Sequence, residues 1–323
     1  MRFYRSDIAS DKEWNEFLHL NYDLFFDYSF LKYNDEFNKG IAWHHLKIKD
    51  DTKNKIVSVL TGCEVSENGK KQFISCNGTS FGGFMWRNRT SLINKIALLK
   101  EFIDYLKQNG FDECILRNPP NYYKRNFNEE YEYALLECGF EISLCSITNI
   151  INLNNFGFDK LANPKKRSIN KSEKIITVSR LENPVTKESF APYYKVLYDD
   201  RQRKNVIPTH SLEELVFLKN SIPERIQIFY AELNRRIAGV CILFIVRDDI
   251  ILNFYLAADE EFKKDRISDF ILYKSIEWAK QSNFKLYDIG TSNIGNTFLP
   301  GLFDFKKKFL ADGFLRKTFK HKF

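Results

Sequence analysis

A carboxylate and a run of lysines lie close together near the carboxyl end of this 323-residue chain. The short apolar run 285–289 predicts a buried strand that carries Asp288 to its carboxyl end. The Asn-, Gly- and Pro-containing residues that follow predict a loop beside that strand end. Lys306 comes after Phe305 in a segment that returns from this loop, so we expect its ammonium near Asp288. A cation there would stabilise an oxyanion or a leaving-group oxygen, and a carboxylate would orient an amine or a hydroxyl.

Each of these residues also has an interpretation that involves no chemistry. Asp288 could cap the loop that follows it through Asx-type hydrogen bonds. The phenylalanines of residues 301–309 could be core residues and the lysines between them a solvated face. We assign Lys307 and Lys308 to such a solvated face, and keep both interpretations open for Lys306 and Asp288.

Two stretches of the chain predict the same order of strands, helix and strand, as would be needed to position such a site. The first is expected to contain strands at 56–65, 72–76 and 112–117, a turn at Asn68-Gly69, and a helix at 92–109 with apolar residues every three or four positions. The second is expected to contain strands at 226–232, 237–246, 250–257 and 285–289, and a helix at 268–282 capped by Ser268. The repeated order indicates an internal duplication of fold.

The sequence Tyr-Asp-Ile-Gly at 287–290, the polar loop and Gly-Leu-Phe-Asp-Phe-Lys-Lys-Lys-Phe at 301–309 resemble a known signature. It is the carboxyl-terminal signature of the Fem-type aminoacyltransferases and their relatives in the GNAT acyltransferase superfamily. The resemblance implies an α/β fold with mixed sheets and two tandem GNAT-like lobes, which we place at residues 1–155 and 156–323. It implies an enzyme that transfers an aminoacyl or acyl group to an amine of a peptidoglycan or surface-polysaccharide precursor, by direct attack and without a covalent enzyme intermediate.

The resemblance also implies roles for individual residues. Lys306 meets negative charge on the donor or the intermediate, and Phe305 stacks on a base or ring. In GNAT lobes two neighbouring parallel strands splay apart and the donor lies in the opening. Here those strands are 250–257 and 285–289, which makes Asn253 and Tyr255 candidates to line the site.

Two arginines form a further candidate site. The family has an arginine that helps to bind acceptor phosphate in a segment comparable to that of Arg201 and Arg203, and a guanidinium suits bidentate phosphate contacts. The alternative for both residues is a surface cluster of arginine and aspartate.

The resemblance leaves the acyl donor open between aminoacyl-tRNA and acyl-CoA, and it implies no permanently bound cofactor. Acyl-CoA-binding lobes carry a glycine-rich loop before the central helix, whereas residues 259–268 contain no glycine. This difference argues against ordinary CoA binding. The acceptor is expected to be a small-molecule or lipid-linked amine, with peripheral contact with a membrane as a further expectation.

Composition sets the remaining limits. Charged residues make up 28% of the chain, and no apolar run reaches the roughly 20 residues of a membrane span, so we expect a cytoplasmic protein. The six cysteines lack the spacing of a zinc site, which predicts no metal and reduced thiols. A formal charge of +7 permits a phosphate-bearing partner. A non-catalytic nucleic-acid or polysaccharide binding module and an acetyl-CoA-dependent GNAT N-acetyltransferase stay as alternatives.

Overall fold

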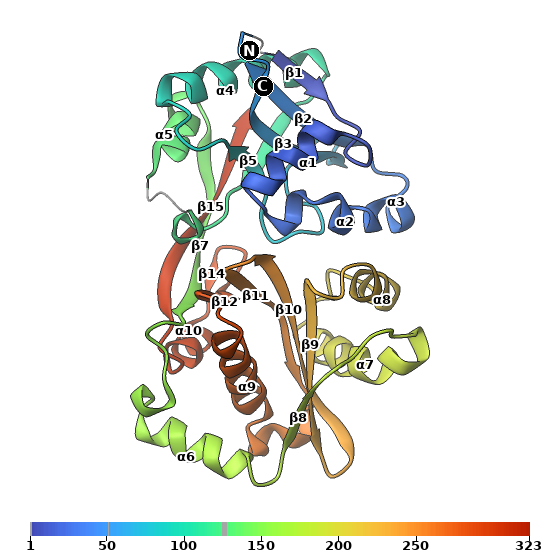
Figure 1. Cartoon of the computed structure of the whole chain (residues 1–323), viewed down its shortest axis with the longest axis vertical. Coiled ribbons are helices and arrows are strands. Elements are labelled where there is room, and N and C mark those ends of the chain that lie inside the picture. The colour runs from blue at the N-terminus through green and yellow to red at the C-terminus, as the bar shows by residue number, and fades with distance from the viewer. Residues whose placement is uncertain (1, 51, 125–127) are drawn as a thin grey trace. The chain divides into compact units, whose positions relative to one another are not determined.

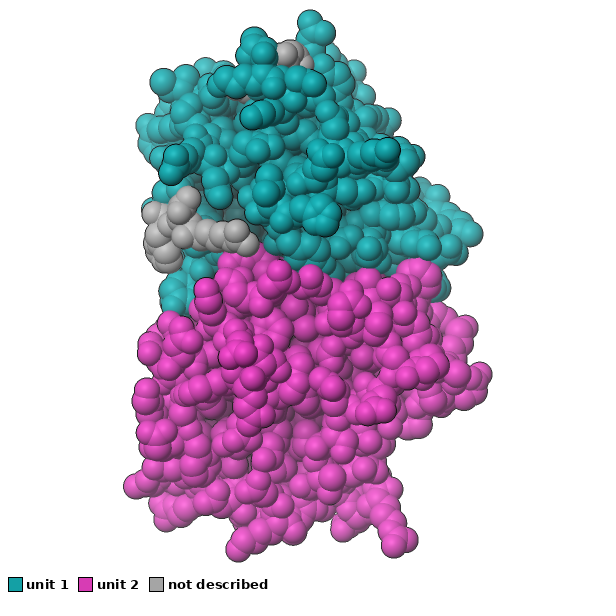
Figure 2. Space-filling model, in the orientation of Figure 1, with its two compact units in different colours: residues 1–147, 293–297, 314–323 teal, residues 148–292, 298–313 magenta. Residues whose placement is uncertain are grey.

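The computed structural model describes residues 2–50, 52–124 and 128–323, and the chain divides into two compact units (Figures 1 and 2). Unit 1 comprises Met1–Ile147, Asn293–Thr297 and Phe314–Phe323, and unit 2 comprises Thr148–Ser292 and Phe298–Gly313. The division therefore falls inside a strand, before the expected boundary at 155/156. It also assigns the last ten residues to unit 1, where they pair with a strand of that unit.

The elements of unit 1 follow the chain from its first residues. They are β1 (Arg2–Arg5), α1 (Lys12–Leu20), η1 (Leu24–Phe26), α2 (Tyr28–Leu31), α3 (Tyr33–Phe37), β2 (Trp43–Asp50), β3 (Lys55–Glu67), β4 (Lys70–Ile74), β5 (Gly83–Trp86), α4 (Leu92–Gln108), β6 (Glu113–Arg117), η2 (Asn121–Tyr123), α5 (Glu130–Glu137) and the first part of β7 (Glu141–Asn152). Most of the last strand, β15 (Asp312–Lys322), also belongs to this unit.

The sheet of unit 1 has the order β1-β2-β3-β4-β6-β15-β7, with β5 beside β3. The hairpin from β3 to β4 forms at Asn68 and Gly69, whose φ angles of 53° and 75° fit the type I′ turn predicted from Asn-Gly. Helix α4 starts after Ser91, whose side chain accepts a hydrogen bond from the Asn94 N–H, and it packs its apolar stripe on the sheet. After α4 the chain returns as β6, parallel to β4.

Unit 2 begins within β7. Its further elements are η3 (Phe158–Lys160), α6 (Asn163–Ser172), β8 (Thr177–Arg180), α7 (Lys187–Arg203), α8 (Leu212–Ser221), β9 (Ile226–Leu233), β10 (Arg236–Arg247), β11 (Ile250–Ala258), η4 (Glu260–Asp265), α9 (Ile267–Gln281), β12 (Leu286–Thr291) and α10 (Pro300–Lys307). The short strands β13 (Asn293–Ile294) and β14 (Thr297–Phe298) pair with each other between β12 and α10.

The sheet of unit 2 has the order β7-β12-β11-β10-β9-β8. Helix α9 packs on one face of β9, β10 and β11, and α7 packs on β10 and β11 from the other face (Figure 1). The chain passes from β11 through α9 into β12, which runs parallel to β11. Both units thus close a parallel pair of strands through a helix, which confirms the predicted α/β class with mixed sheets.

Two details of unit 2 differ from the sequence-based expectation. Helix α9 begins at Ile267, after Arg266 in a left-handed conformation (φ 62°), so Ser268 is inside the helix and is not its cap. Pro300 and Gly301, expected in a loop, open helix α10, because proline fits the first turn of a helix, where its missing N–H has no partner to lose. Among the described residues, no helix combines the length and the apolar character that a membrane crossing needs.

Candidate functional site

The two parallel strands of unit 2 separate at a defined residue pair. Their register runs from Ile250 opposite Leu286 to Leu252 opposite Asp288 and ends there. Strand β11 nevertheless continues to Ala258 and β12 to Thr291. Beyond Leu252 the two strands are no longer paired, as the resemblance to GNAT lobes implied for this pair.

The pairing of β12 with its other neighbour, β7, is interrupted by an irregularity near the end of the strand. Asp288 lies opposite Ile150 and Thr291 opposite Thr148, so Ile289 and Gly290 together face the single residue between them. This irregularity is a β-bulge, and Gly290 adopts the positive φ of 81° that it requires. The carboxyl end of β12 is thus unpaired with β11 beyond Asp288, while on its β7 side it keeps a pair at Thr291 after the bulge.

Lys306 is hydrogen-bonded to the carboxyl end of β12. Its Nζ donates hydrogen bonds of 2.7 Å to both the Gly290 and the Thr291 carbonyl oxygens, and its side chain is only 3% exposed. Burial lowers the pKa of Lys306 to about 8, against the opposing influence of the Asp288 charge. The side chain therefore reaches the end of β12, as expected, and its identified partners there are backbone carbonyls.

Asp288 is buried at the same strand end and makes local hydrogen bonds. Its Oδ1 accepts from the Gly290 N–H at 2.7 Å and from the Thr148 hydroxyl at 2.6 Å. The first of these is the Asx-type bond of the loop-capping interpretation. The carboxylate thus shapes the bulge of β12, while its charge acts on Lys306.

Asn253 and Tyr255 lie on opposite faces of the sheet, although simple alternation would place them on one face. In the register with β10, Asn253 is opposite Leu243 and Tyr255 is opposite Ile242, so Phe254 is an extra residue. This bulge reverses the alternation. Asn253 consequently faces α9, whereas Tyr255 faces the side covered by α7.

Tyr255 anchors the segment between α7 and α8. Its hydroxyl accepts a hydrogen bond from the His210 backbone N–H at 3.0 Å and lies 3.0 Å from the His210 Nδ1. Tyr255 is buried, which raises the pKa of its phenol, and the Arg201 guanidinium lies 5.6 Å from its ring centroid. These contacts make Tyr255 a link between β11 and the end of α7.

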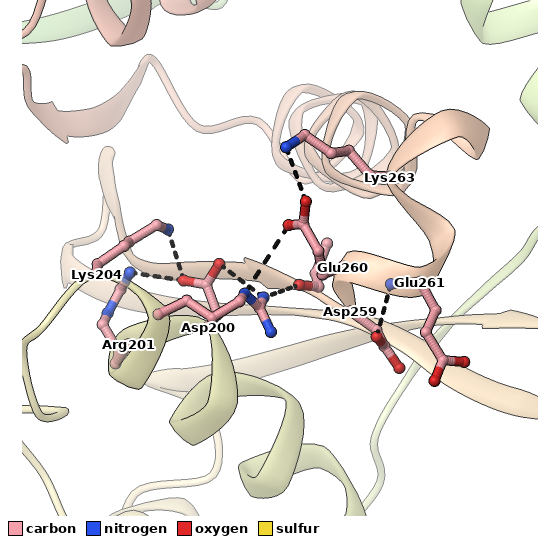
Figure 3. A network of polar contacts seen from close by, with 9 residues as sticks. Asp200, Arg201, Lys204, Asp259, Glu260, Glu261 and Lys263 are labelled. Atoms are coloured by element: carbon pink, nitrogen blue, oxygen red, sulfur yellow. Dashed lines mark hydrogen bonds and ion pairs between the residues drawn. The ribbon is translucent and has the colours of Figure 1, made fainter.

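Arg201 and Arg203 lie in a network of charges at the end of α7 (Figure 3). The buried carboxylate of Asp200 is 3.0 Å from an Arg201 nitrogen, 3.5 Å from an Arg203 nitrogen and 2.6 Å from the Lys204 ammonium. Arg203 also donates to the Ala258 carbonyl at 2.7 Å. This arrangement matches the arginine–aspartate cluster given as the alternative, and a second carboxylate, Glu260, lies 3.9 Å from Arg203.

Phe305 lies between an ammonium group and the core of unit 2. Its ring is in edge contact with Phe309 (5.5 Å between centroids), and the Lys165 Nζ lies 5.3 Å from its centroid. Lys165 in turn donates to Asp269, a buried residue in the first turn of α9, which Arg266 also contacts at 3.2 Å. The amino-terminal end of α9, where CoA-binding lobes hold a diphosphate, thus carries a carboxylate of the protein itself.

Beyond the Leu252–Asp288 pair, β11 and β12 leave an opening between them. The sequence analysis missed three polar groups that the fold places on the α9 side of this opening. Tyr287 and Ser275 are fully buried and hydrogen-bonded to each other, and Asn149, opposite the bulge of β12, has a buried side-chain nitrogen without a partner. A serine inside the apolar stripe of a predicted helix was the available signal for Ser275. No local signal marked Asn149, because its strand lies far away in the sequence.

Comparison with known proteins shows the class of fold that these elements define. No protein-family model matches the sequence, and no curated protein matches it. Among solved structures, a tandem GNAT protein from the clavulanic acid biosynthesis pathway is similar with a TM-score of 0.63 and 9% identity, over 99% of this chain and 98% of that chain. The chain therefore has a tandem GNAT-like fold, as predicted.

Two further solved structures define the likeness more narrowly. The crystal structure of FemX matches with a TM-score of 0.71 and 12% identity, over 100% of this chain and 98% of that chain. L-PGS from Bacillus licheniformis matches with a TM-score of 0.61 and 13% identity, over 87% of this chain and 84% of that chain. The particular version of the tandem fold seen here is thus a Fem-like one.

Proposed function

We propose that this chain is an N-acyltransferase that moves an aminoacyl or acyl group onto an amine of a cell-envelope precursor. The observation that carries the proposal is the opening beyond the Leu252–Asp288 pair, with the buried ammonium of Lys306 fixed at its edge. Amine attack on an ester or thioester needs two reactants held together and an oxyanion stabilised, and it needs no covalent nucleophile. An opened strand pair beside a buried cation meets both requirements. The Fem-like tandem fold supports the same reaction class.

In this mechanism the amine nitrogen attacks the acyl carbon, the carbonyl oxygen gains negative charge, and the leaving oxygen or sulfur departs as the nitrogen loses a proton. Lys306 uses two of its three N–H groups on the Gly290 and Thr291 carbonyls, and the third would meet the developing charge. Phe305 would stack on a base or ring of the donor, and Asp288 would orient the amine. Arg201 and Arg203 would bind acceptor phosphate through guanidinium hydrogen bonds.

The donor is proposed to be an aminoacyl ester on tRNA in preference to acyl-CoA. A CoA diphosphate at the start of α9 would meet the carboxylate of Asp269, and its natural counter-ion there, Lys165, is already paired with that carboxylate. The preceding segment, 259–268, also lacks the glycines that expose backbone N–H groups to phosphate. The acceptor is a small-molecule or lipid-linked amine, of which a peptidoglycan precursor and a polysaccharide amino sugar are the two classes to test.

A mass-spectrometric screen tests the proposal. The purified chain is incubated with charged tRNAs or acyl-CoAs as donors, and with peptidoglycan precursors, lipid-linked precursors or amino-sugar nucleotides as acceptors. We expect the mass of one acceptor class to rise by one aminoacyl residue with a charged tRNA, and no rise with the Lys306→Met variant. Transfer from acetyl-CoA would establish the ordinary N-acetyltransferase alternative. No transfer from any donor, with RNA or glycan binding retained, would favour a binding module.

A further inference from the structure

A chain of buried polar side chains runs from α9 to the opening between β11 and β12. The Ser275 Oγ lies 2.7 Å from the Tyr287 hydroxyl, and the Asn253 Nδ2 donates to that hydroxyl at 3.4 Å. Ser275 and Tyr287 are 0% exposed and Asn253 is 5% exposed. The chain lies wholly within unit 2 and links β11, β12 and α9.

The Ser275 hydroxyl proton sets the direction of these bonds, and Cys241 also belongs to the cluster, with its Sγ 3.7 Å from the Ser275 Oγ and 3.9 Å from the Tyr287 hydroxyl. Ser275 donates its one hydroxyl proton to the Leu272 carbonyl at 2.8 Å, so it accepts at the Tyr287 side. Tyr287 therefore donates its own proton to Ser275 and has only an acceptor left for Asn253. Asn253 must then turn its NH₂ group toward Tyr287. Its carbonyl oxygen, Oδ1, is directed to the other side.

The Asn253 Oδ1 has no hydrogen-bond partner in the structure, although it is buried. Leaving such an oxygen unsatisfied destabilises the folded state, so proteins keep such groups where they serve a purpose. Asn253 is the first residue of β11 beyond its last pair with β12, Leu252 opposite Asp288. The backbone of Asn253 thus stands at the edge of the opening in which the proposed reaction takes place. As a pure acceptor, the Oδ1 requires a ligand that brings an N–H or O–H group.

We propose that the Asn253 Oδ1 receives an N–H of the amino group next to the reacting carbon, and that Tyr287 and Ser275 are positioning residues that hold it in that direction. The assignment rests on the proposed function. Two amino groups have the required chemistry, the α-amino group of an aminoacyl donor and the attacking amine of the acceptor. A simple acyl group such as acetyl has none, so the first source would make Asn253 a determinant of donor specificity.

Binding of two matched probes separates these sources. The probes are 3′-alanylamido-3′-deoxyadenosine, a stable mimic of a charged tRNA end, and its propionyl twin, which lacks only the amino group. If the donor supplies the N–H, calorimetry on the wild type should show about tenfold tighter binding of the alanyl probe, the value of one hydrogen bond to a charged group. Asn253→Ala should bind both probes equally. Asn118→Ala is the matched control, because it removes a buried amide without partners from unit 1, and it should keep the preference.

If the acceptor supplies the N–H, Asn253→Ala should instead lower turnover about tenfold with alanyl and propionyl donors alike. The assignment is overturned if Asn253→Ala retains both the probe preference and the turnover of the wild type. Failure of the wild type to bind either probe or to transfer from any donor contradicts the proposed function itself. The two outcomes can be told apart, because the Asn253 assignment is overturned only by a comparison with a wild type that binds or transfers.

The positioning role has its own readout. Tyr287→Phe keeps the ring in the core but lets the Asn253 amide rotate. The variant should therefore lose most of the preference for the alanyl probe, or most of the turnover if the acceptor supplies the N–H. Its melting temperature should stay near that of the wild type. Because both residues act through one oxygen, Asn253→Ala/Tyr287→Phe should lose no more than Asn253→Ala alone. Additive losses would mean that Tyr287 acts independently of Asn253. Ser275→Ala frees the Tyr287 proton and should resemble Tyr287→Phe.

Discussion

At the scale of single residues, Lys306 is the proposed oxyanion-stabilising cation, and it is also hydrogen-bonded to the carboxyl end of β12. Both roles follow from one position, because an ammonium that bonds the Gly290 and Thr291 carbonyls stands at the edge of the opening. Its neighbours in the sequence have a different environment. Lys307 is exposed and paired with Asp312 at 2.9 Å, and Lys308 is exposed.

We predict that Lys306→Met lowers turnover by a hundredfold or more, roughly the loss when one oxyanion-stabilising group is removed. Substrate affinity should change much less, because the charge acts mainly in the transition state. Lys307→Met is the control and should stay close to the wild type. The measurement is kcat and KM of both variants beside their melting temperatures. Similar, mild effects at both lysines would show that Lys306 is only a structural clamp.

The lowered pKa of Lys306 predicts a pH effect on stability that needs no substrate. Between about pH 8 and the ordinary lysine pKa of 10.5, the unfolded chain still binds a proton that the folded chain has lost. The free energy of unfolding of the wild type should therefore rise with pH through this window relative to Lys306→Met, by on the order of 3 kcal/mol. Urea denaturation at several pH values measures the difference. A parallel pH dependence of the two proteins would mean that Lys306 titrates normally.

At the scale of elements, the start of α9 is organised by a carboxylate of its own first turn. Asp269 and Lys165 are each about nine-tenths buried or more and bonded to each other, and the Lys165 ammonium lies 4.2 Å from the Phe309 ring centroid. The pair thus joins α6, α9 and the segment that follows α10. Burial lowers the pKa of Lys165, and the Asp269 carboxylate opposes that shift.

We predict that Lys165→Met destabilises the protein by roughly 3–5 kcal/mol, because it leaves the Asp269 charge buried with the partly exposed Arg266 as its remaining partner. Lys165→Met/Asp269→Leu should recover most of the loss, since it removes both charges. Chemical denaturation of the two variants gives the comparison. If the double variant is as unstable as the single one, packing and not the charge pair is responsible.

At the scale of the whole molecule, two units repeat one supersecondary plan, and the candidate site is built in the second. Unit 1 carries its own parallel pair, β4 with β6, in which Gln72 faces Glu113 and Ile74 faces Ile115. The residues proposed to act on the substrate lie in unit 2, and they depend on the bulges of β11 and β12.

We predict that the chain binds free coenzyme A weakly and charged tRNA in a salt-dependent manner. The segment before α9 has no glycine to offer N–H groups to a diphosphate, and the Lys165 ammonium at the start of α9 is already paired with Asp269. Binding of tRNA, in contrast, releases counterions and weakens steeply with salt. Calorimetry with coenzyme A, and tRNA binding between about 50 and 200 mM salt, are the measurements. Tight, salt-insensitive coenzyme A binding would contradict this prediction and favour the acetyl-CoA-dependent N-acetyltransferase.

The sequence by itself determined those features that depend on neighbouring residues. The spacing of apolar residues located α4, Asn68-Gly69 located a hairpin, and the apolar run ending at Asp288 located β12. Such signals act within one turn or one strand, so they can be read along the chain. The tandem fold followed from finding the same order twice.

Only the tertiary structure decided how the site is assembled. The bulge at Phe254 separates Asn253 from Tyr255, and the return of β15 to unit 1 shifts the expected division of the chain. The partners of Lys306 and the free oxygen of Asn253 likewise depend on pairing and burial between distant segments. Register and hydrogen-bond partners are properties of two segments together, and no pattern within either segment alone specifies them.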